Sequence, residues 1–168
     1  MAGGPVKYWG HGFSLRGEKN RFVLPADFRT TVRNSSDGQR TLCLDLHAEL
    51  PCLVGFGLSR VDEFEAQIER EFDMAKALGD KTFNRTTREG QLYGFTPTSF
   101  DESGRFVLPE HLGNSREVGD ALYFHGGGSS FTIWSPDRLL AIGEGWESAQ
   151  ASCRALMAEA AAGKGRRK

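Results

Sequence analysis

The stretch "RFVLP" occurs twice in the chain, at residues 21–25 and 105–109, and the two copies lie 84 positions apart. The match extends at this offset, because "YWGHGFSLRGEKNRFVLP" (8–25) aligns with "LYGFTPTSFDESGRFVLP" (92–109). A fixed internal offset is typical of a duplicated structural unit. The sequence therefore predicts two related halves, residues 1–80 and residues 81–168, the second ending in a helical, basic tail.

Each copy is expected to form a hairpin. A strand of aromatic and small residues leads into a polar turn, "GEKN" or "DESG", and the short apolar strand Phe-Val-Leu follows. Three consecutive apolar residues are typical of a strand that is buried on both faces. Pro25 and Pro109 end these strands because proline has no N–H to donate, and each can open a short helix.

Further apolar segments follow each hairpin, "TLCLDL" and "PCLVGFGLS" in the first half and "ALYF" and "FTIWSPDRLL" in the second. A helical pattern comes next, and in residues 59–79 we expect Ser59 to cap the helix and Gly79 to end it. Because each half is too small for a large core of its own, the two are expected to pair through their Phe-Val-Leu strands. This predicts an α+β, mainly β fold, a pseudo-twofold β-barrel with outer helices.

Charge is distributed unevenly along the 168 residues, although the net charge is only −1. Residues 1–40 carry a net charge of +4, and residues 41–80 carry −6. The total therefore indicates no particular partner, but the basic first quarter can still present a local cationic face.

The three cysteines, Cys43, Cys52 and Cys153, form no C-x-x-C pair and are expected to be reduced thiols. Cys43, His47 and Cys52 lie close in sequence, but a structural zinc site needs four ligands at tighter paired spacing. We therefore expect neither a metal nor a cofactor. No apolar stretch has the length of a signal peptide or membrane span, so we expect a cytoplasmic protein without membrane contact.

The run "HGGG" at residues 125–128 is similar to the oxyanion loop of esterases. That loop works with a G-x-S-x-G nucleophile elbow, and the chain contains no such pentapeptide. The glycines stand between two apolar strands, where a turn requires positive φ angles. The run is therefore interpreted as a turn, and we expect no enzymatic activity.

The doubled motif resembles that of the MraZ family of bacterial transcriptional regulators, in which D-x-x-x-R precedes a short apolar strand and a proline. The second copy, "DESGRFVLP" (101–109), matches the pattern fully. The segments "CLVGFGLSRVDEFEAQI" (52–68) and "GGGSSFTIWSPDRL" (126–139) are similar to the segments that follow each family hairpin. The resemblance covers most of residues 8–140.

The resemblance implies two tandem SpoVT-AbrB-like swapped-hairpin halves. It also implies binding to double-stranded DNA at repeated operator elements, usually as a repressor of the division and cell-wall gene cluster. The implied partners are DNA and further copies of the chain in a ring-like homo-oligomer, and the implied location is the nucleoid.

The first motif departs from the family pattern, because Gly17 stands where the second copy has Asp101. Asp101 is expected to cap its turn and to pair with Arg105, and Glu18 is a partial substitute in the first turn. The candidate DNA contacts are cationic side chains on or just after the two turns: Arg16, Lys19, Arg21, Arg29 and Arg105. The first turn has more of these cations, so we expect the N-terminal hairpin to carry most of the DNA contact.

Other interpretations remain open. Arg21 and Arg105 could serve only to fix their turns, and Arg29 could lie on an ordinary solvated helix face. The chain could be an oligomeric structural or protein-interaction module that has lost specific DNA binding, which Gly17 favours. An antitoxin of a toxin–antitoxin pair is a third alternative, but such hairpins usually pair between chains, whereas this duplication lies within one chain.

Overall fold

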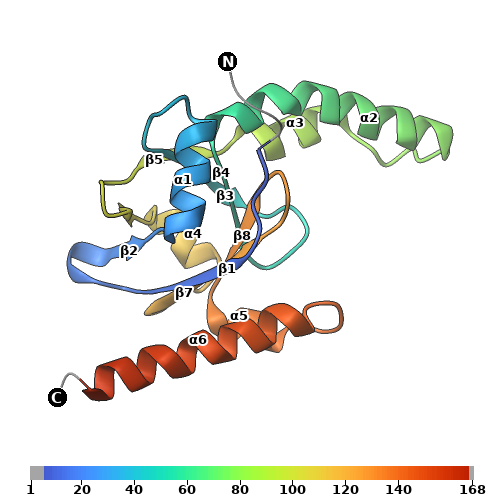
Figure 1. The fold of residues 1–168 in the computed structure, drawn as a ribbon. Helices are drawn as coiled ribbons and strands as arrows, with labels where there is room; N and C mark the ends of the chain where they lie inside the picture. The colour runs from blue at the N-terminus through green and yellow to red at the C-terminus, as the bar shows by residue number, and fades with distance from the viewer. Residues whose placement is uncertain (1–5, 167–168) are drawn as a thin grey trace.

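The computed structural model describes residues 6–166 and has an α+β architecture (Figure 1). The strands are β1 (His11–Leu15), β2 (Arg21–Val23), β3 (Thr41–Leu46), β4 (Leu53–Phe56), β5 (Thr96–Ser99), β6 (Arg105–Val107), β7 (Ala121–Gly126) and β8 (Phe131–Trp134). The α-helices are α1 (Ala26–Ser35), α2 (Phe64–Ala77), α3 (Arg85–Tyr93), α4 (Glu110–Ser115), α5 (Pro136–Ala141) and α6 (Glu147–Arg166). Two 3-10 helices, η1 (Glu18–Asn20) and η2 (Leu58–Glu63), complete the list.

Six strands form one antiparallel sheet in the order β1-β7-β8-β4-β3-β5, and β2 and β6 form a separate two-stranded sheet. The order is symmetric about the central β8–β4 pair. Counted outward from this pair, β8, β7 and β1 of the second and first repeats occupy the same places as β4, β3 and β5. The ladders thus give two sheets, and the predicted closure into a barrel stays a prediction.

The first strand of each repeated segment pairs with a strand of the other half. β1 pairs with β7, and β5 pairs with β3, so neither pairs with the motif strand that follows it in sequence. β1 and β2 are still joined by a bond from the Val23 N–H to the Ser14 hydroxyl, 2.8 Å long. The local hairpin ladder suggested by the sequence is therefore replaced by pairing between halves.

The two Phe-Val-Leu runs meet each other, as expected. β2 and β6 pair antiparallel, with Phe22 opposite Phe106. Both phenylalanines are buried, but Val23 and Val107 are 38% and 53% exposed. The prediction that these strands are buried on both faces is therefore wrong, because successive side chains point to opposite sides of a strand.

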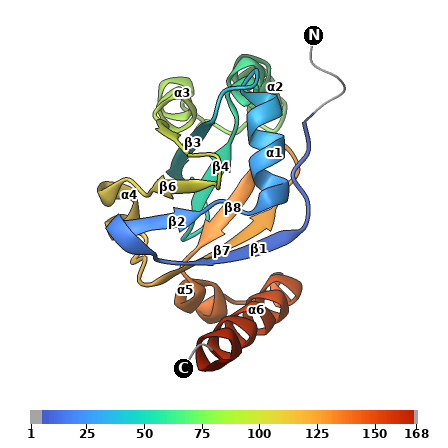
Figure 2. The same cartoon turned by 60° about the vertical axis from the view of Figure 1, so that its left-hand side comes forward.

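The two faces of the large sheet are covered by different elements. Neighbouring residues of a strand point to opposite faces and therefore pack in different apolar clusters. Leu44 and Phe124 pack in the main core together with Phe22 and Phe106 of the ribbon and Phe28 of α1. On the opposite face, helices α2 and α3 cover one end, and α5 and α6 cover the other (Figure 1). The β2–β6 ribbon lies at the side of the body, between these two helical groups (Figure 2).

The predicted helix starts and stops are confirmed only in part. Helices α1 and α4 follow Pro25 and Pro109 directly, and Gly79 takes a φ of +68° just after α2. Ser59 does not cap α2, which begins at Phe64; its hydroxyl lies 2.6 Å from that of Ser35 instead.

Helix α3 was not predicted from the sequence. Asn84 caps it, and the Asn84 side chain accepts a hydrogen bond from the Thr87 N–H at 2.9 Å. The aligned segment from residue 92 was expected to be a strand throughout, but Leu92 and Tyr93 end this helix, and β5 begins only at Thr96.

The "HGGG" run lies where β7 turns into β8, as predicted. Gly128 has a φ of +88°, and the Gly127 N–H donates to the Ser130 carbonyl at 3.0 Å. The His125 ring is bonded to the Tyr123 hydroxyl at 2.8 Å. Among residues 6–166, no helix has both the length and the apolar character needed to cross a membrane.

Candidate nucleic-acid interface

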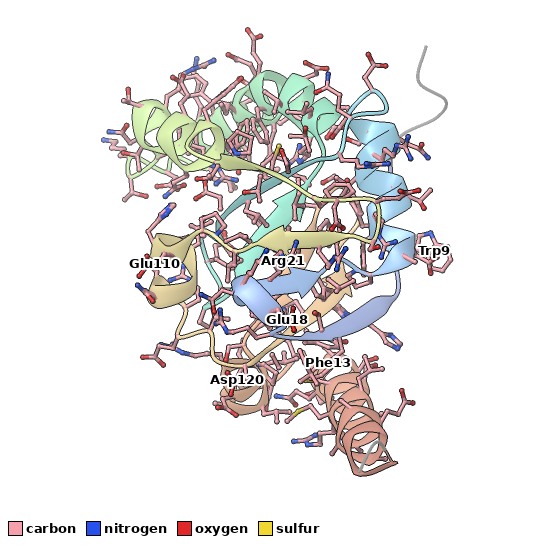
Figure 3. All side chains as sticks on the ribbon, turned by 90° about the vertical axis from the view of Figure 1, so that its left-hand side faces the viewer. Trp9, Phe13, Glu18, Arg21, Glu110 and Asp120 are labelled. Carbon is pink, nitrogen blue, oxygen red and sulfur yellow. The ribbon has the colours of Figure 1, made fainter. Side chains whose placement is uncertain are left out.

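The β2–β6 ribbon places both motif arginines on one outward face. Phe22 and Phe106 point inward, so the alternation of a strand puts Arg21 and Arg105 on the other side. Arg21 stands opposite Val107, and Arg105 stands opposite Val23. The two arginines are thus diagonal neighbours, a pair that lies about 7–8 Å apart in an antiparallel ladder. Arg21 and Glu18 are labelled on this side in Figure 3.

The second turn, residues 101–105, is organised by one carboxylate. Asp101 Oδ1 accepts from the backbone N–H groups of Ser103 at 3.0 Å and Arg105 at 2.9 Å, and Oδ2 accepts from Arg105 Nε at 2.8 Å. The Arg105 N–H is the largest cause that lowers the pKa of Asp101, and the Arg105 guanidinium adds to it. Gly104 completes the turn with a φ of +87°. The predicted cap and ion pair at Asp101 are therefore confirmed.

The first turn, residues 17–21, keeps one backbone bond and lacks the carboxylate. The Gly17 N–H donates to the Arg21 carbonyl at 2.7 Å, as the Asp101 N–H does to the Arg105 carbonyl at 3.0 Å. Lys19 and Asn20, however, have φ angles of 58° and 57°. Asparagine is enriched in this left-handed region and lysine is not, so the turn holds a less favourable backbone conformation.

Glu18 does not replace the missing carboxylate. Its side chain is exposed, and within the described residues it makes no hydrogen bond or ion pair. Lys19 is also exposed on the turn. The first turn therefore presents a cation whose position no neighbouring side chain fixes.

Arg16 is held by the second half of the chain. Its Nη2 and Nε atoms donate to the Gly119 carbonyl at 2.7 and 3.2 Å. Its guanidinium carbon also lies 4.8 Å from the centre of the Phe22 ring. These contacts tie the first turn to the segment before β7, and they occupy part of the guanidinium.

Arg29 also points into the molecule. It is half-buried on α1, and its Nη2 donates to the Leu24 carbonyl at 3.0 Å. Its Nε is buried and has no partner in the described part of the chain. Arg29 is thus not on an ordinary solvated helix face. Arg33, one turn later, is exposed and donates to the Gly38 carbonyl at 3.1 Å.

Arg21 differs from both. It is half-buried at the ribbon, and its Nε, like that of Arg29, is buried and has no hydrogen-bond partner among residues 6–166. Because no internal acceptor fixes this atom, the side chain can turn toward an external one without breaking a bond at Nε. Of the five candidate cations, Lys19, Arg21 and Arg105 thus remain on the outer side of the ribbon and its turns, while Arg16 and Arg29 are held by backbone carbonyls.

Two residues of this surface were missed by the sequence analysis. Val23 and Val107 lie on the same outward face as the arginines, and their exposure is high for apolar side chains. The signal available was the alternation of side-chain direction along a strand, which places Val23 on the same side as Arg21 and Val107 on the same side as Arg105. The apolar run Phe-Val-Leu suggested burial on both faces instead.

Comparison with known proteins adds the family. No family model matches the chain. The transcriptional regulator MraZ of Caulobacter vibrioides (strain NA1000 / CB15N) is 34% identical over 118 residues, which cover 70% of this chain and 69% of the relative. The chain belongs to the MraZ family. MraZ of Azorhizobium caulinodans is 35% identical with 73% of each chain covered, and MraZ of Gluconobacter oxydans is 26% identical with 82% of this chain and 79% of the relative covered. Each of these MraZ relatives is named a transcriptional regulator and none is named an enzyme.

Proposed function

We propose that the chain is a sequence-specific DNA-binding transcriptional regulator that represses the division and cell-wall gene cluster from a cytoplasmic, nucleoid-associated position. The observation that carries the proposal is the pairing of β2 with β6, which puts Arg21 and Arg105 on the same outward face, diagonal to each other. The names of the MraZ relatives support the same role.

The dimensions of the ribbon suit the major groove. Two strands about 4.7–4.9 Å apart fit a groove about 12 Å wide, and β-ribbons read DNA in this way in other regulators. An arginine can bond both O6 and N7 of guanine, which discriminates by about 1–3 kcal/mol per contact. We assign this role to Arg21 and Arg105, and we assign phosphate contact to Lys19 on the first turn.

The roles of Arg16 and Arg29 are proposed to be different. Their guanidinium groups already donate to the carbonyls of Gly119 and Leu24. Any direct contact with DNA would have to compete with these bonds. Gly17, Glu18 and Asp101 are assigned to the shape of the turns, with Asp101 fixing its turn and Gly17 leaving the first one looser.

The two halves, residues 1–80 and 81–168, are proposed to be duplicates of one swapped-hairpin unit. The symmetric strand order and the exchange of β1 and β5 support this origin.

We further propose a ring-like homo-oligomer. Helix α2 and its C-cap carry exposed apolar side chains, Phe72 and Met74 on the helix and Leu78 at the cap, which suit contact with another copy. Several subunits could then engage several operator repeats, which would raise the overall affinity by about 10²–10⁴.

A gel-shift titration tests the proposal, with the duplex that lies upstream of the gene encoding this chain as probe. We expect binding that weakens with salt, and Arg21→Ala should reduce it. Lys19→Ala should lower the salt slope by about one unit, because one phosphate contact is lost. Arg154→Ala is the matched control, since Arg154 is exposed on α6, away from the ribbon.

The same titration tests the alternative of an oligomeric interaction module without specific DNA binding. The first turn, with Gly17 and a left-handed Lys19, favours that alternative. It predicts an oligomer in size-exclusion chromatography together with equal gel shifts for Arg21→Ala, Lys19→Ala and Arg154→Ala. That combination would overturn the DNA-binding proposal.

A further inference from the structure

Two equivalent positions in the duplicated halves hold very different residues. Arg29 lies four residues after Pro25, and Gly113 lies four residues after Pro109. The turns to which they correspond also differ, since Asn20 aligns with Gly104 at the offset of 84. The pseudo-twofold arrangement therefore allows one contact to be compared in two places within one molecule.

At the first of these positions, the Arg29 side chain contacts the turn of the other half. A Cβ added at Gly104 would lie 2.4 Å from Arg29 Nε and 2.7 Å from its Cζ, so the guanidinium lies directly against this glycine. The same guanidinium donates to the Leu24 carbonyl, and the Leu24 N–H donates to the Gly104 carbonyl at 2.8 Å. Arg29, Leu24 and Gly104 thus form a continuous link between α1 and the second turn.

At the second of these positions, Gly113 has no side chain that could match the contact of Arg29. Gly113 borders a cavity of 410 Å³ that is also lined by Arg16, Asn20, Val107 and Leu108. Within the described residues, no backbone bond joins Leu108 to Asn20 in the way that Leu24 is joined to Gly104. The first turn therefore lacks counterparts of the Arg29 contact and of the Leu24–Gly104 bond, and Arg16, just before the turn, is what ties it to the second half.

We propose that Arg29 is a positioning residue that clamps the second turn from the opposite half, and that Gly113 leaves the first turn without such a clamp. As a DNA-binding device this inference rests on the proposed function, whereas the clamp itself does not. The second turn then has three restraints, the Asp101 carboxylate, the bond from the Leu24 N–H to the Gly104 carbonyl and the Arg29 contact, and the first turn has no counterpart of any of them. Arg105 is thus presented rigidly, while Lys19 adapts to the DNA that it meets.

Hydrogen exchange in the full-length protein tests the clamp without DNA. Arg29→Ala removes the guanidinium that lies against Gly104, together with its hydrogen bond to the Leu24 carbonyl. Because the second turn then opens more readily, we expect the amides of Gly104 and Arg105 to exchange about tenfold faster. Arg33→Ala is the matched control, because Arg33 lies one turn further along α1 and donates to Gly38 instead. Arg29→Lys keeps the charge but loses the planar guanidinium, so it should behave like Arg29→Ala. Equal exchange of residues 101–105 in Arg29→Ala and Arg33→Ala would overturn the clamp.

A second variant keeps the test decisive if Arg29→Ala fails to fold. Gly113→Arg should place a guanidinium in the cavity beside Asn20 and slow exchange at residues 17–21. A Cβ at Gly113 would lie 3.2 Å from a terminal methyl group of Leu108, which can yield by a small rotation. Unchanged exchange at residues 17–21 in Gly113→Arg would contradict the equivalence of the two places.

A gel shift with the upstream duplex separates positioning from direct contact. If Arg29 acts only by positioning, Arg29→Ala should weaken binding without changing the salt slope. If Arg29 touches a phosphate, the slope should fall by about 0.9 unit, and the positioning role would be wrong. If the unmodified protein does not bind this duplex, the proposed function fails, and the exchange experiment still decides the clamp.

Discussion

Asp101 and Arg105 are joined twice, through the backbone N–H of Arg105 at 2.9 Å and through its Nε at 2.8 Å, and both bonds end on the same carboxylate. This double contact shapes the turn and orients the arginine at once. In the first turn the corresponding pair is Gly17 and Arg21, and only the bond between their main chains remains.

The first prediction concerns the protonation of Asp101. Its native pKa lies below the ordinary value of 3.8, mainly because of the Arg105 N–H. A lowered carboxyl pKa means that the stabilisation of the turn is present above the ordinary value and is lost as pH falls through the native value. Carboxyl NMR titration checks this. In Arg105→Ala we expect the pKa to rise only partly, since the backbone bond persists. A pKa at or above 3.8 in the unmodified protein would contradict the account.

The second prediction restores the missing carboxylate. Gly17 has a φ of −101° and a ψ of −165°, which any residue can adopt. Gly17→Asp should therefore accept from the Lys19 N–H, and from the Arg21 N–H in competition with the Glu18 carbonyl, and raise the free energy of unfolding by about 0.5–1.5 kcal/mol. Urea denaturation measures this against Gly17→Ala, which lacks the carboxylate. Equal stability of the two variants would show that the first turn cannot use an aspartate.

The third prediction uses two glycines with the same backbone angle. Gly10 and Gly104 both have a φ of +87°, but a Cβ at Gly10 would meet nothing within 4 Å, whereas one at Gly104 would collide with Arg29. Gly10→Ala should cost roughly 1–2 kcal/mol for the left-handed conformation alone. Gly104→Ala should cost more, and adding Arg29→Ala should remove the excess. Denaturation of the double variant checks this, and strict additivity would argue against the contact.

The fourth prediction follows from the exchange of strands. β1 pairs with β7, β5 with β3, and β4 with β8, so each half supplies the neighbours of the other. Residues 1–80 and residues 81–168 expressed separately should lack cooperative unfolding, and mixing them should restore it. Circular dichroism during thermal melting measures this. A cooperative transition for residues 1–80 alone would contradict the dependence of one half on the other.

The sequence predicted local features better than contacts between distant residues. The duplication, the two prolines that open helices and the turn at residues 125–128 depend on residue types next to one another, so they could be recognised directly. The pairing of β1 with β7 involves two segments far apart in the chain, and no local pattern specifies it. The exposure of Val23 and Val107 was missed because an apolar run was interpreted as burial on both faces.

The candidate site shows the same division. Asp101 and Arg105 are four residues apart, and their pairing could be predicted from the turn they share. The contact of Arg29 with Gly104 joins two halves, so the sequence suggested only a cation on a helix. Helix α3 was missed because the alignment of the two halves assigned its last residues to a strand, although Asn84 is a typical helix cap.

The most direct measurement for the proposed interface is site-specific photo-crosslinking to the upstream duplex. A photoreactive residue at Val107 lies on the outward face of the ribbon, next to both motif arginines, and one at Leu78 lies at the C-terminal end of α2 with still greater exposure. We predict crosslinks to DNA from position 107 and none from position 78. Crosslinks from position 78 without any from position 107, under conditions where the duplex is bound, would contradict the assignment of the β2–β6 ribbon as the DNA-binding surface.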